Sequence, residues 1–318
     1  MNLQLDQDIS KGIGEILTRI QLSSEMISLI QSSLNADSKT GELYKWAHLT
    51  LLSCECVSEV TEVALPGAIA MELFALAADI FDDIQDQDNN DLAWRKLTNA
   101  NAINLAICLL MLSYEAVSKI PDNRLFREVS TILNRTGICA SNAQFQEFLY
   151  NSCERVTLEQ YFDLIKSKAG SLAACACKIG ATLGGASESL VSQLDQYGTN
   201  LGIMSQIRND LNDFLDFERK KDFENNTKTL PYVYLSSTLQ GDTADQFKKL
   251  TQLESKGLRR FGNEERDYLK KIAFNEGAVH YCTVMFEIYR QKAMDIVQAI
   301  PVLEKRKEKL IKLVEEHV

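Results

Sequence analysis

Residues 65–91 read LPGAIAMELFALAADIFDDIQDQDNND, an apolar stretch that ends in acidic residues. The part from Ala68 to Phe81 is almost wholly apolar, which predicts a helix that is buried on most sides. Asn89 and Asn90 mark the expected end of this helix. Six aspartates and no basic residue stand within thirteen residues at that end: Asp79, Asp82, Asp83, Asp86, Asp88 and Asp91. The stretch therefore predicts a core helix with negative charge concentrated at its C-terminus.

Acidic residues are unfavourable in this position. A carboxylate in the last turn meets the negative end of the helix dipole, which costs roughly 0.3–1 kcal/mol per charge before repulsion between the acids is counted. The four aspartates from Asp79 to Asp86 stand three or four residues apart and so share one helix face. Oxygen ligands on one face suit a hard cation such as Mg²⁺. We predict a metal site here, and the alternative is a solvated acidic helix end.

Composition limits the class of protein and of partner. A chain of 318 residues with 45% hydrophobic content is long and apolar enough to bury a large core. No linker divides it, so we expect a single domain over residues 1–318. The formal net charge of -10 argues against a surface for nucleic acid or anionic membranes, because such surfaces need basic patches. An anionic substrate would need basic residues supplied locally.

The N-terminus and the cysteines indicate the compartment. The first ten residues, MNLQLDQDIS, lack a signal-peptide pattern, and no apolar run reaches the ~20 residues of a membrane span. The eight cysteines, among them Cys54, Cys56, Cys175 and Cys177, lie in apolar helical stretches without C-x-x-C spacing, which predicts buried free thiols. We therefore expect a cytoplasmic protein without stable membrane insertion.

The whole chain predicts one helix after another, with four prolines and no convincing alternation of a strand. An all-α fold follows from this pattern. The predicted helices cover residues 7–33, 42–62, 66–88, 92–118, 123–137, 138–151, 157–184, 187–218, 229–240, 242–254, 261–275, 277–299 and 302–316.

A second acidic cluster lies at Gln206-Ile-Arg-Asn-Asp-Leu-Asn-Asp213, again in the C-terminal half of a predicted helix. Within it, Asn209, Asp210 and Asp213 repeat the spacing of the first cluster. Helical bundles commonly build metal sites from carboxylates on facing helices. The basic residues Arg219, Lys220, Lys221 and Lys228 follow soon after. Together these features predict a polyphosphate bound through Mg²⁺ and lysine or arginine, whereas each base alone is also typical of a solvated loop.

Six short segments resemble those of the trans-isoprenyl diphosphate synthases, the polyprenyl synthetase family. Asp82-Asp83-Ile-Gln-Asp86 resembles the first aspartate-rich DDxxD motif, and residues 206–213 resemble the second, with Asn209 in place of its first aspartate. Lys168-Ala-Gly-Ser-Leu172 resembles the KTG-x-L segment, and Gln144-Phe-Gln-Glu147 resembles GQxxD. Lys221-Asp222 and Lys228-Thr-Leu-Pro231 resemble the basic loop that closes over the diphosphate.

The resemblance implies an isoprenoid-synthase helical bundle with a central active-site cavity. It also implies roles for residues at the matching positions. The implied catalytic residues are Asp82, Asp86, Lys168 and Asp210. The implied metal ligands, for a magnesium cluster on an allylic diphosphate, are drawn from Asp82, Asp83, Asp86, Asn209, Asp210 and Asp213. The expected substrate-binding residues are Phe74, Ala78, Gln144, Lys168, Gln206, Lys221 and Lys228.

The helix before the first motif would form the wall along which the hydrocarbon tail runs. Ala78 is small and lies one turn before Asp82, whereas Phe74 lies one turn deeper and would form the floor. We therefore expect a farnesyl or geranyl group to fit.

Departures from the family pattern concern the acceptor. Chain-elongating members carry a glycine-lysine-arginine-proline segment and a double arginine for a second diphosphate. This chain reads GELYKWAH at residues 41–48 and LAWRK at residues 92–96 instead. Trp46 and Trp94 lie in these places, where either ordinary packing or an acceptor groove would account for them. The absence of these two basic segments favours an acceptor that carries no diphosphate.

Within the family, the sequence at residues 79–96, 165–172 and 286–293 resembles most the ComQ-type enzymes, which attach an isoprenyl group to a tryptophan of a quorum-sensing pheromone precursor. The resemblance therefore implies a pheromone peptide as partner. A short-chain prenyl diphosphate synthase and a class I terpene cyclase are the alternative enzymes, the latter because of the Asn-Asp start of the second motif. A non-catalytic subunit of a heteromeric synthase is a third alternative, and a homodimer is one assembly that we leave open.

Overall fold

The computed structural model of the protein describes residues 3–36, 43–87, 89–215, 227–251 and 262–316. Every regular element in these ranges is a helix, and none of the residues so described forms a β-strand. The predicted all-α fold is confirmed. In chain order the elements are α1 (Leu3–Ile20), α2 (Ser24–Ala36), α3 (Lys45–Val57), η2 (Glu62–Ala64), α4 (Leu65–Asp86), η3 (Ala93–Lys96), α5 (Asn99–Val117), α6 (Asn123–Asn151), α7 (Leu158–Ile165), η4 (Lys166–Gly170), α8 (Ser171–Leu183), α9 (Glu188–Leu215), α10 (Leu230–Thr238), α11 (Gly241–Thr251), α12 (Asn263–Asn275), α13 (Ala278–Ala299) and α14 (Glu304–Glu316).

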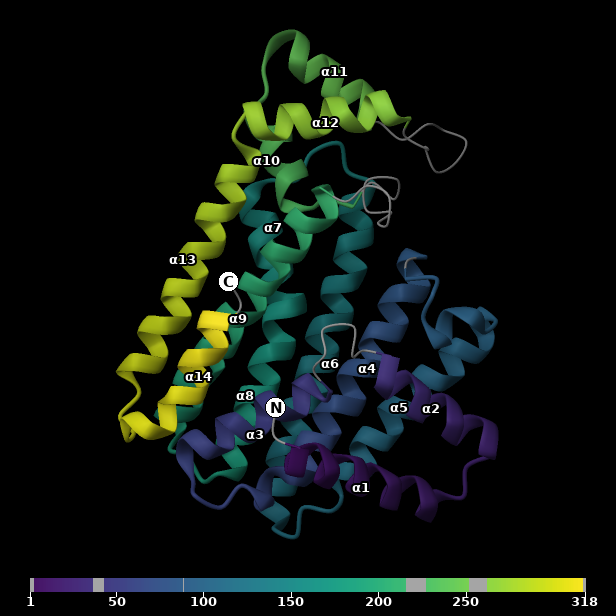
Figure 1. Ribbon diagram of the computed structural model, residues 1–318, viewed down its shortest axis with the longest axis vertical. Helices are drawn as coiled ribbons and strands as arrows, with labels where there is room; N and C mark the ends of the chain where they lie inside the picture. The colour runs from purple at the N-terminus through teal and green to yellow at the C-terminus, as the bar shows by residue number, and fades with distance from the viewer. Residues whose placement is uncertain (1–2, 37–42, 88, 216–226, 252–261, 317–318) are drawn as a thin grey trace. The chain divides into compact units, whose positions relative to one another are not determined.

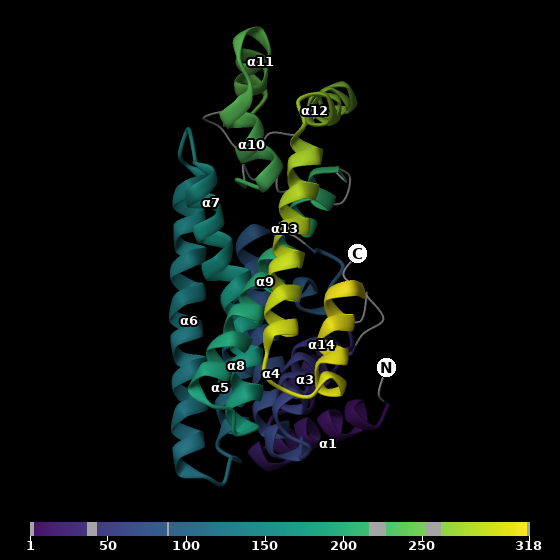
Figure 2. The ribbon, with the colours of Figure 1, turned by 90° about the vertical axis from the view of Figure 1, so that its left-hand side faces the viewer.

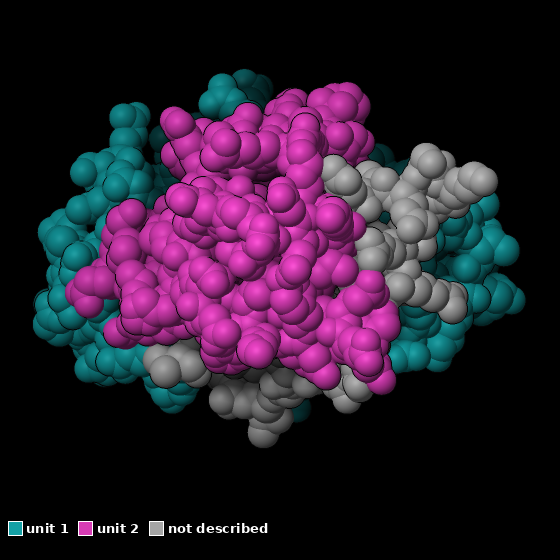
Figure 3. Space-filling model, turned by 90° about the horizontal axis from the view of Figure 1, so that it is seen from above, with its two compact units in different colours: residues 1–137, 172–198, 294–318 teal, residues 138–171, 199–293 magenta. Residues whose placement is uncertain are grey.

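The chain divides into two compact units, drawn in teal and magenta in Figure 3. Unit 1 comprises residues 1–137, 172–198 and 294–318, and unit 2 comprises residues 138–171 and 199–293. The division falls inside α6, α9 and α13, and at the junction of η4 with α8. The expectation of a single domain stays a prediction.

The core of unit 1 is organised around α4, which packs against α1, α3 and α5 (Figure 1). Pro66 stands in its first turn, where a missing N–H costs nothing, and thirteen of its residues are buried. The helix ends at Gln87, whose left-handed φ of 57° stops the helical path. The quoted stretch therefore forms the predicted buried helix, with its acids in the final turns.

Two helices of unit 1 are long and apolar enough to cross a membrane by length and composition alone. They are the stretch Glu62–Asp86, which contains α4, and α5. This corrects the expectation that no apolar run reaches the length of a span. Most of the apolar part of α4 is buried inside the structure, which is typical of a core helix.

Unit 2 is built on a second apolar core, to which α7, α9, α10, α12 and α13 contribute buried side chains. Within it α10 contacts both α7 and α11 (Figure 2). Gly202 of α9 lies directly against the carbonyl of Ala169 in η4, where any Cβ would collide with that backbone. This close approach brings the π-helical turn η4 and the helix that carries the second acidic cluster together.

Four helix boundaries differ from those predicted. The expected helix 7–33 is two helices, because Gln21 adopts a left-handed φ of 55° between α1 and α2. The expected helix 92–118 begins anew at Asn99, where the Thr98 side chain accepts a hydrogen bond from the backbone N–H of Asn101. The expected helices 123–137 and 138–151 are one helix, α6, since Gly137 is tolerated in its interior. The expected helix 157–184 contains η4 in its middle.

The cysteines are free thiols, as predicted, but the prediction that they are buried is wrong for Cys108 and Cys139, which are half-buried, and for Cys153, which is exposed. Cys54, Cys56, Cys175 and Cys177 are all buried. Burial raises the pKa of the Cys175 and Cys177 thiols to about 12, so both stay protonated and unreactive at neutral pH.

Candidate active site

The first acidic motif occupies the last two turns of α4, in unit 1. Asp82 and Asp86 are half-buried and stand four residues apart, so they share one face of the helix. No basic residue occupies the last turn of α4. Two carboxylates at the negative end of the helix dipole make this face a place where a cation would be stabilised.

Asp83, the middle acid of this motif, has a different environment. Its side chain is 7% exposed, and it accepts hydrogen bonds from the Trp94 indole at 2.8 Å and from the Asn89 amide at 2.7 Å, one on each oxygen. Trp94 itself is buried. Asp83 therefore anchors the segment that follows α4 to the helix end, and Trp94 is placed by this contact.

The helix before the motif carries the two residues expected along the tail of the donor. Phe74 is buried and lies against α6, where its ring would be 3.4 Å from a Cβ built on Gly137. Ala78 is half-buried, one turn nearer to Asp82. Phe74 is thus the more buried of the two residues, and their places along the tail of the donor stay predictions.

The second acidic cluster lies on α9 in unit 2. Asn209 is exposed and Asp213 is half-buried, whereas Asp210 between them is 5% exposed. Among the described residues, three groups donate hydrogen bonds to Asp210. Its donors are the Tyr161 hydroxyl at 2.6 Å, the Gln206 side-chain amide at 2.7 Å and the backbone N–H of Leu230 at 2.8 Å. The buried acid of this cluster is thus tied to α7 and to the start of α10.

Lys168 and the Gln144–Glu147 segment also meet in unit 2. Lys168, in η4, donates to the Glu147 carboxylate on α6 at 2.6 Å, and both side chains are largely buried. The Gln144 Nε2 is buried and has no hydrogen-bond partner within the described part of the chain. Such a buried donor is costly unless it is satisfied, so a polar ligand is one way to satisfy it.

Lys228 is 5% exposed, although it is a charged side chain. Its amine donates to the Tyr232 hydroxyl at 3.1 Å and lies 4.3 Å from the centre of the Tyr232 ring. The lysine is therefore held onto the first turn of α10. Lys221 lies outside the described residues.

The donor set fits Mg²⁺ in its chemistry. All the candidate ligands are carboxylate or amide oxygens, and Mg²⁺ usually takes one or two protein carboxylates and fills its other positions with water and substrate phosphate. Across the described residues, no group of three or more His, Cys, Asp or Glu side chains is gathered closely enough to hold a metal unaided. The oxygen donors of the candidates therefore fit a Mg²⁺ ion that also binds substrate phosphate.

Sequence reasoning missed Glu72 and Tyr161. The Glu72 carboxylate is buried and accepts hydrogen bonds from the backbone N–H groups of Trp46 and Ala47, so it caps α3. An acid in the middle of the apolar run was the available signal for Glu72. Tyr161 precedes its partner Asp210 by 49 residues, and no local pattern indicates that pairing.

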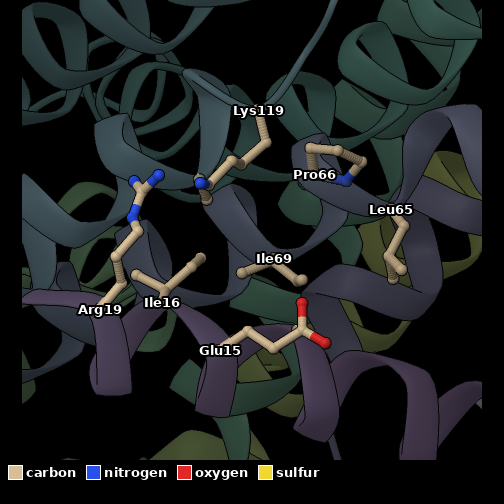
Figure 4. Close-up of a pocket in the computed structure, with 9 residues that line it drawn as sticks. Glu15, Ile16, Arg19, Leu65, Pro66, Ile69 and Lys119 are labelled. Carbon is tan, nitrogen blue, oxygen red and sulfur yellow. The ribbon is translucent and has the colours of Figure 1, made fainter.

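A pocket of about 410 Å³ lies elsewhere in unit 1, between α1, the first turns of α4 and the end of α5 (Figure 4). Ile16, Leu65 and Ile69 form apolar walls, and the charged side chains of Glu15, Arg19 and Lys119 surround them. None of its lining residues is a candidate for donor or metal binding. The predicted central cavity stays a prediction.

Comparison with known proteins gives related sequences and folds. Residues 45–261 match the model of the family described as polyprenyl synthetase. The chain is 27% identical over 300 residues, 94% of each sequence, to the tryptophan prenyltransferase ComQ of Bacillus subtilis (strain 168). It is 28% identical over 273 residues, 82% of this chain and 80% of the other, to the short chain isoprenyl diphosphate synthase of Methanocaldococcus jannaschii.

Solved structures show the same fold. A polyprenyl synthetase from Streptomyces coelicolor A3(2) superposes with a TM-score of 0.86 at 22% identity, over 99% of this chain and 98% of that one. A geranylgeranyl pyrophosphate synthase superposes with a TM-score of 0.84 at 21% identity, over 98% of both chains. These likenesses confirm the predicted class of helical bundle.

Proposed function

The chain belongs to the polyprenyl synthetase family and is an isoprenyl transferase, and from this premise we propose that it moves a farnesyl or geranyl group from an allylic diphosphate to a tryptophan of a peptide. The predicted family and enzyme class are thereby confirmed. One observation carries the proposal: similarity to a tryptophan prenyltransferase extends over 94% of both chains. The missing basic segments at residues 41–48 and 92–96 support it further, since an indole needs no cations.

The donor diphosphate is the leaving group, and its negative charge grows as the allylic C–O bond breaks. We propose that Asp82 and Asp86, with Asn209, Asp210 and Asp213 as further candidates, hold Mg²⁺ against its oxygens. When bound, Mg²⁺ would supply Lewis-acid stabilisation of that charge. Asp83 is a weaker candidate, because both its oxygens already accept hydrogen bonds.

Basic and amide groups of unit 2 would bind the rest of the diphosphate. Lys168 and Lys228 would donate to phosphate oxygens, and Lys221 is proposed for the same role from sequence alone. Gln144 brings a buried Nε2 donor without a protein partner in the described ranges, and Gln206 already donates to Asp210. Before the donor binds, the ion pair with Glu147 compensates the largely buried charge of Lys168. The diphosphate would then replace Glu147 as the partner of Lys168.

The allylic cation that remains must be kept from water until the acceptor attacks. The apolar face of α4, including Phe74 and Phe81, would line the hydrocarbon chain, and aromatic faces stabilise a neighbouring cation. The indole carbon or nitrogen then forms the new bond, and the proton it loses passes to a base or to diphosphate.

A short-chain prenyl diphosphate synthase is the second candidate function. The 28% identity to the Methanocaldococcus jannaschii enzyme favours it. The two functions differ in their acceptor, so product formation from diphosphates alone separates them.

The proposed function is tested with the purified protein, Mg²⁺ and geranyl or farnesyl diphosphate. We expect a panel of tryptophan-containing peptides to include members that gain the mass of one isoprenyl group, measured by mass spectrometry. Matched peptides with phenylalanine in place of tryptophan serve as the control and should gain none. Absence of the added mass from every peptide, with longer diphosphates formed instead, would favour the synthase.

The length of the accepted prenyl group should depend on Ala78. We expect Ala78→Phe to shift the preferred donor from farnesyl towards geranyl diphosphate, because the new ring would fill the space between Phe74 and the acidic residues. The measurement is the ratio of kcat/KM for the two donors. Ala78→Val should give a smaller shift in the same direction, and unchanged ratios in both variants would show that the tail does not run along this face.

A quorum-sensing pheromone precursor is the proposed acceptor peptide, and the cytoplasm is the proposed compartment. Neither nucleic acid nor a membrane is proposed as a partner. A homodimer is one possible assembly, and the exposed apolar residues Ile103, Ile107 and Met111 on α5 favour it, because they form one stripe at four-residue spacing.

A further inference from the structure

We propose that Tyr161 is a positioning residue for the donor diphosphate, which acts through Asp210 and the backbone of Leu230 to hold Lys228 in place. This inference rests on the proposed function, since Lys228 is the group that would meet the diphosphate. All four residues lie in unit 2.

Asp210 is the centre of this arrangement. Its Oδ2 accepts from the Tyr161 hydroxyl of α7 at 2.6 Å and from the Leu230 N–H of α10 at 2.8 Å, while its Oδ1 accepts from Gln206 on its own helix. A buried carboxylate needs donors of this kind in place of water. One oxygen atom thus ties α7 to the first residue of α10.

The start of α10 depends on this carboxylate. Thr229 stands at the N-cap position, yet its side chain makes no capping hydrogen bond, and within the described residues its buried Oγ1 has no partner. Asp210 instead accepts from the N–H of Leu230, one of the donors in the first turn that have no partner within the helix. Its negative charge also lies at the positive end of the α10 dipole, which favours the same arrangement.

Lys228 lies two residues before Leu230, the first residue of α10, and its position depends on where that helix begins. Its amine donates to the Tyr232 hydroxyl at 3.1 Å, one turn into the helix, and lies over the Tyr232 ring. The position of the lysine is therefore set by the position of the first turn of α10. A shift of Leu230 away from Asp210 would carry the lysine with it.

Tyr161 keeps the carboxylate in place. The ring is fully buried, and its hydroxyl donates to the Asp210 carboxylate at 2.6 Å. Without that donor, the buried carboxylate would turn towards other partners. Asp210, a predicted metal ligand, would in this arrangement serve mainly to place the lysine, and Asn209 and Asp213 would be left to face the metal.

The test is a double-mutant cycle on the affinity for inorganic pyrophosphate in the presence of Mg²⁺, measured by isothermal titration calorimetry. Tyr161→Phe keeps the ring and removes only the hydroxyl. We expect it to weaken binding about tenfold, on the scale of one hydrogen bond to a charged group. In a Lys228→Met background the same substitution should cause no further loss, because it acts through the lysine.

Tyr197→Phe is the matched control. Tyr197 is also fully buried and donates its hydroxyl to a backbone carbonyl, that of Leu310, so its substitution removes an equivalent group from another place. Pyrophosphate affinity should be unchanged in this variant. Hydrogen exchange at the Leu230 amide should accelerate in Tyr161→Phe and not in Tyr197→Phe, which is a readout independent of activity.

Two results would overturn the inference. One is unchanged pyrophosphate affinity in Tyr161→Phe, and the other is losses that multiply in the double variant, which would show that Tyr161 acts by general stabilisation. If Lys228→Met binds pyrophosphate as tightly as the unmodified protein, the proposed role of Lys228 in donor binding fails instead. The two failures are therefore told apart by the single lysine variant.

Discussion

Asp82→Ala or Asp86→Ala is expected to reduce prenyl transfer by more than about 100-fold, because even the outer partners of metal ligands cost 10–100-fold when removed. Each variant would remove one half-buried carboxylate from the final turns of α4. Neither should lower the stability of the protein without ligands. Removing an acid from the C-terminal end of a helix relieves about 0.3–1 kcal/mol of unfavourable dipole interaction, and it also relieves repulsion between acids four residues apart.

Thermal melting with and without Mg²⁺ plus an allylic thiolodiphosphate, an unreactive donor analogue, separates the effect on ligand binding from the effect on the stability of the free protein. The unmodified protein should melt at a higher temperature with both ligands present, and the two variants should lose that shift. Asp91→Ala is the matched control, since Asp91 is an exposed acid just beyond the motif. If Asp82→Ala and Asp86→Ala keep the full shift, the motif does not hold the metal.

Asp83→Ala, in the same motif, is expected to lower the stability of the protein without ligands, in contrast to Asp82→Ala and Asp86→Ala. It would leave the indole N–H of Trp94 buried without its acceptor, which costs about 1–3 kcal/mol. We therefore expect this variant to melt at a lower temperature even without ligands. An unchanged melting temperature would show that the Asp83–Trp94 hydrogen bond contributes little to stability.

The fold could be predicted because apolar periodicity is strong and local. The run from Ala68 to Phe81 required a buried helix, and α4 is that helix. Breaks such as Gln21 were missed, because a left-handed residue other than glycine leaves no compositional mark. The pattern between Thr157 and Leu183 also did not reveal η4, since a single π-helical turn inside a longer helical stretch leaves no compositional mark.

The sequence predicts the acidic motifs of the candidate site, but not the environment of the individual acids within them. Spacing placed Asp82, Asp83 and Asp86 on one helix face, but it could not tell which acid would be buried. That depends on donors brought in by tertiary structure: Trp94 for Asp83, and Tyr161 for Asp210. The same distinction recurs in both clusters, where the buried acid accepts from an aromatic side chain and its neighbours on the helix stay more exposed. Spacing in the sequence therefore predicts which helix face carries the acids, whereas tertiary packing determines the hydrogen-bond partner of each acid.

Chain elongation is expected to be slow or absent. Given isopentenyl diphosphate, an allylic diphosphate and Mg²⁺, the purified protein should form longer-chain diphosphate at a rate at least about 100-fold below its transfer to a tryptophan peptide. The reason is electrostatic, because a second diphosphate placed beside the first needs fixed cations of its own. Burying a charge without a partner costs several kcal/mol even after relaxation, and each 1.4 kcal/mol in a barrier is tenfold in rate.

The chain offers few such cations where family members supply them. Lys45 is exposed and lies 5.6 Å from the centre of the Trp46 ring, and Arg95 donates to Asn90 at 3.3 Å. With Lys96 they make three basic residues, without the adjacent arginine pair that binds phosphate oxygens in a bidentate manner. Trp94, in the same segment, is buried against Asp83.

The assay compares two acceptors at equal donor concentration, with radiolabelled isopentenyl diphosphate in one reaction and a tryptophan peptide in the other. The Methanocaldococcus jannaschii short chain isoprenyl diphosphate synthase, run in parallel, establishes that elongation is detectable under the conditions used. Elongation by this protein at a comparable rate would mean that three scattered basic residues suffice for the second diphosphate. The assignment would then change from peptide prenylation to diphosphate synthesis. An indole acceptor needs no site for a polyanion, so a working site of that kind would indicate a diphosphate acceptor.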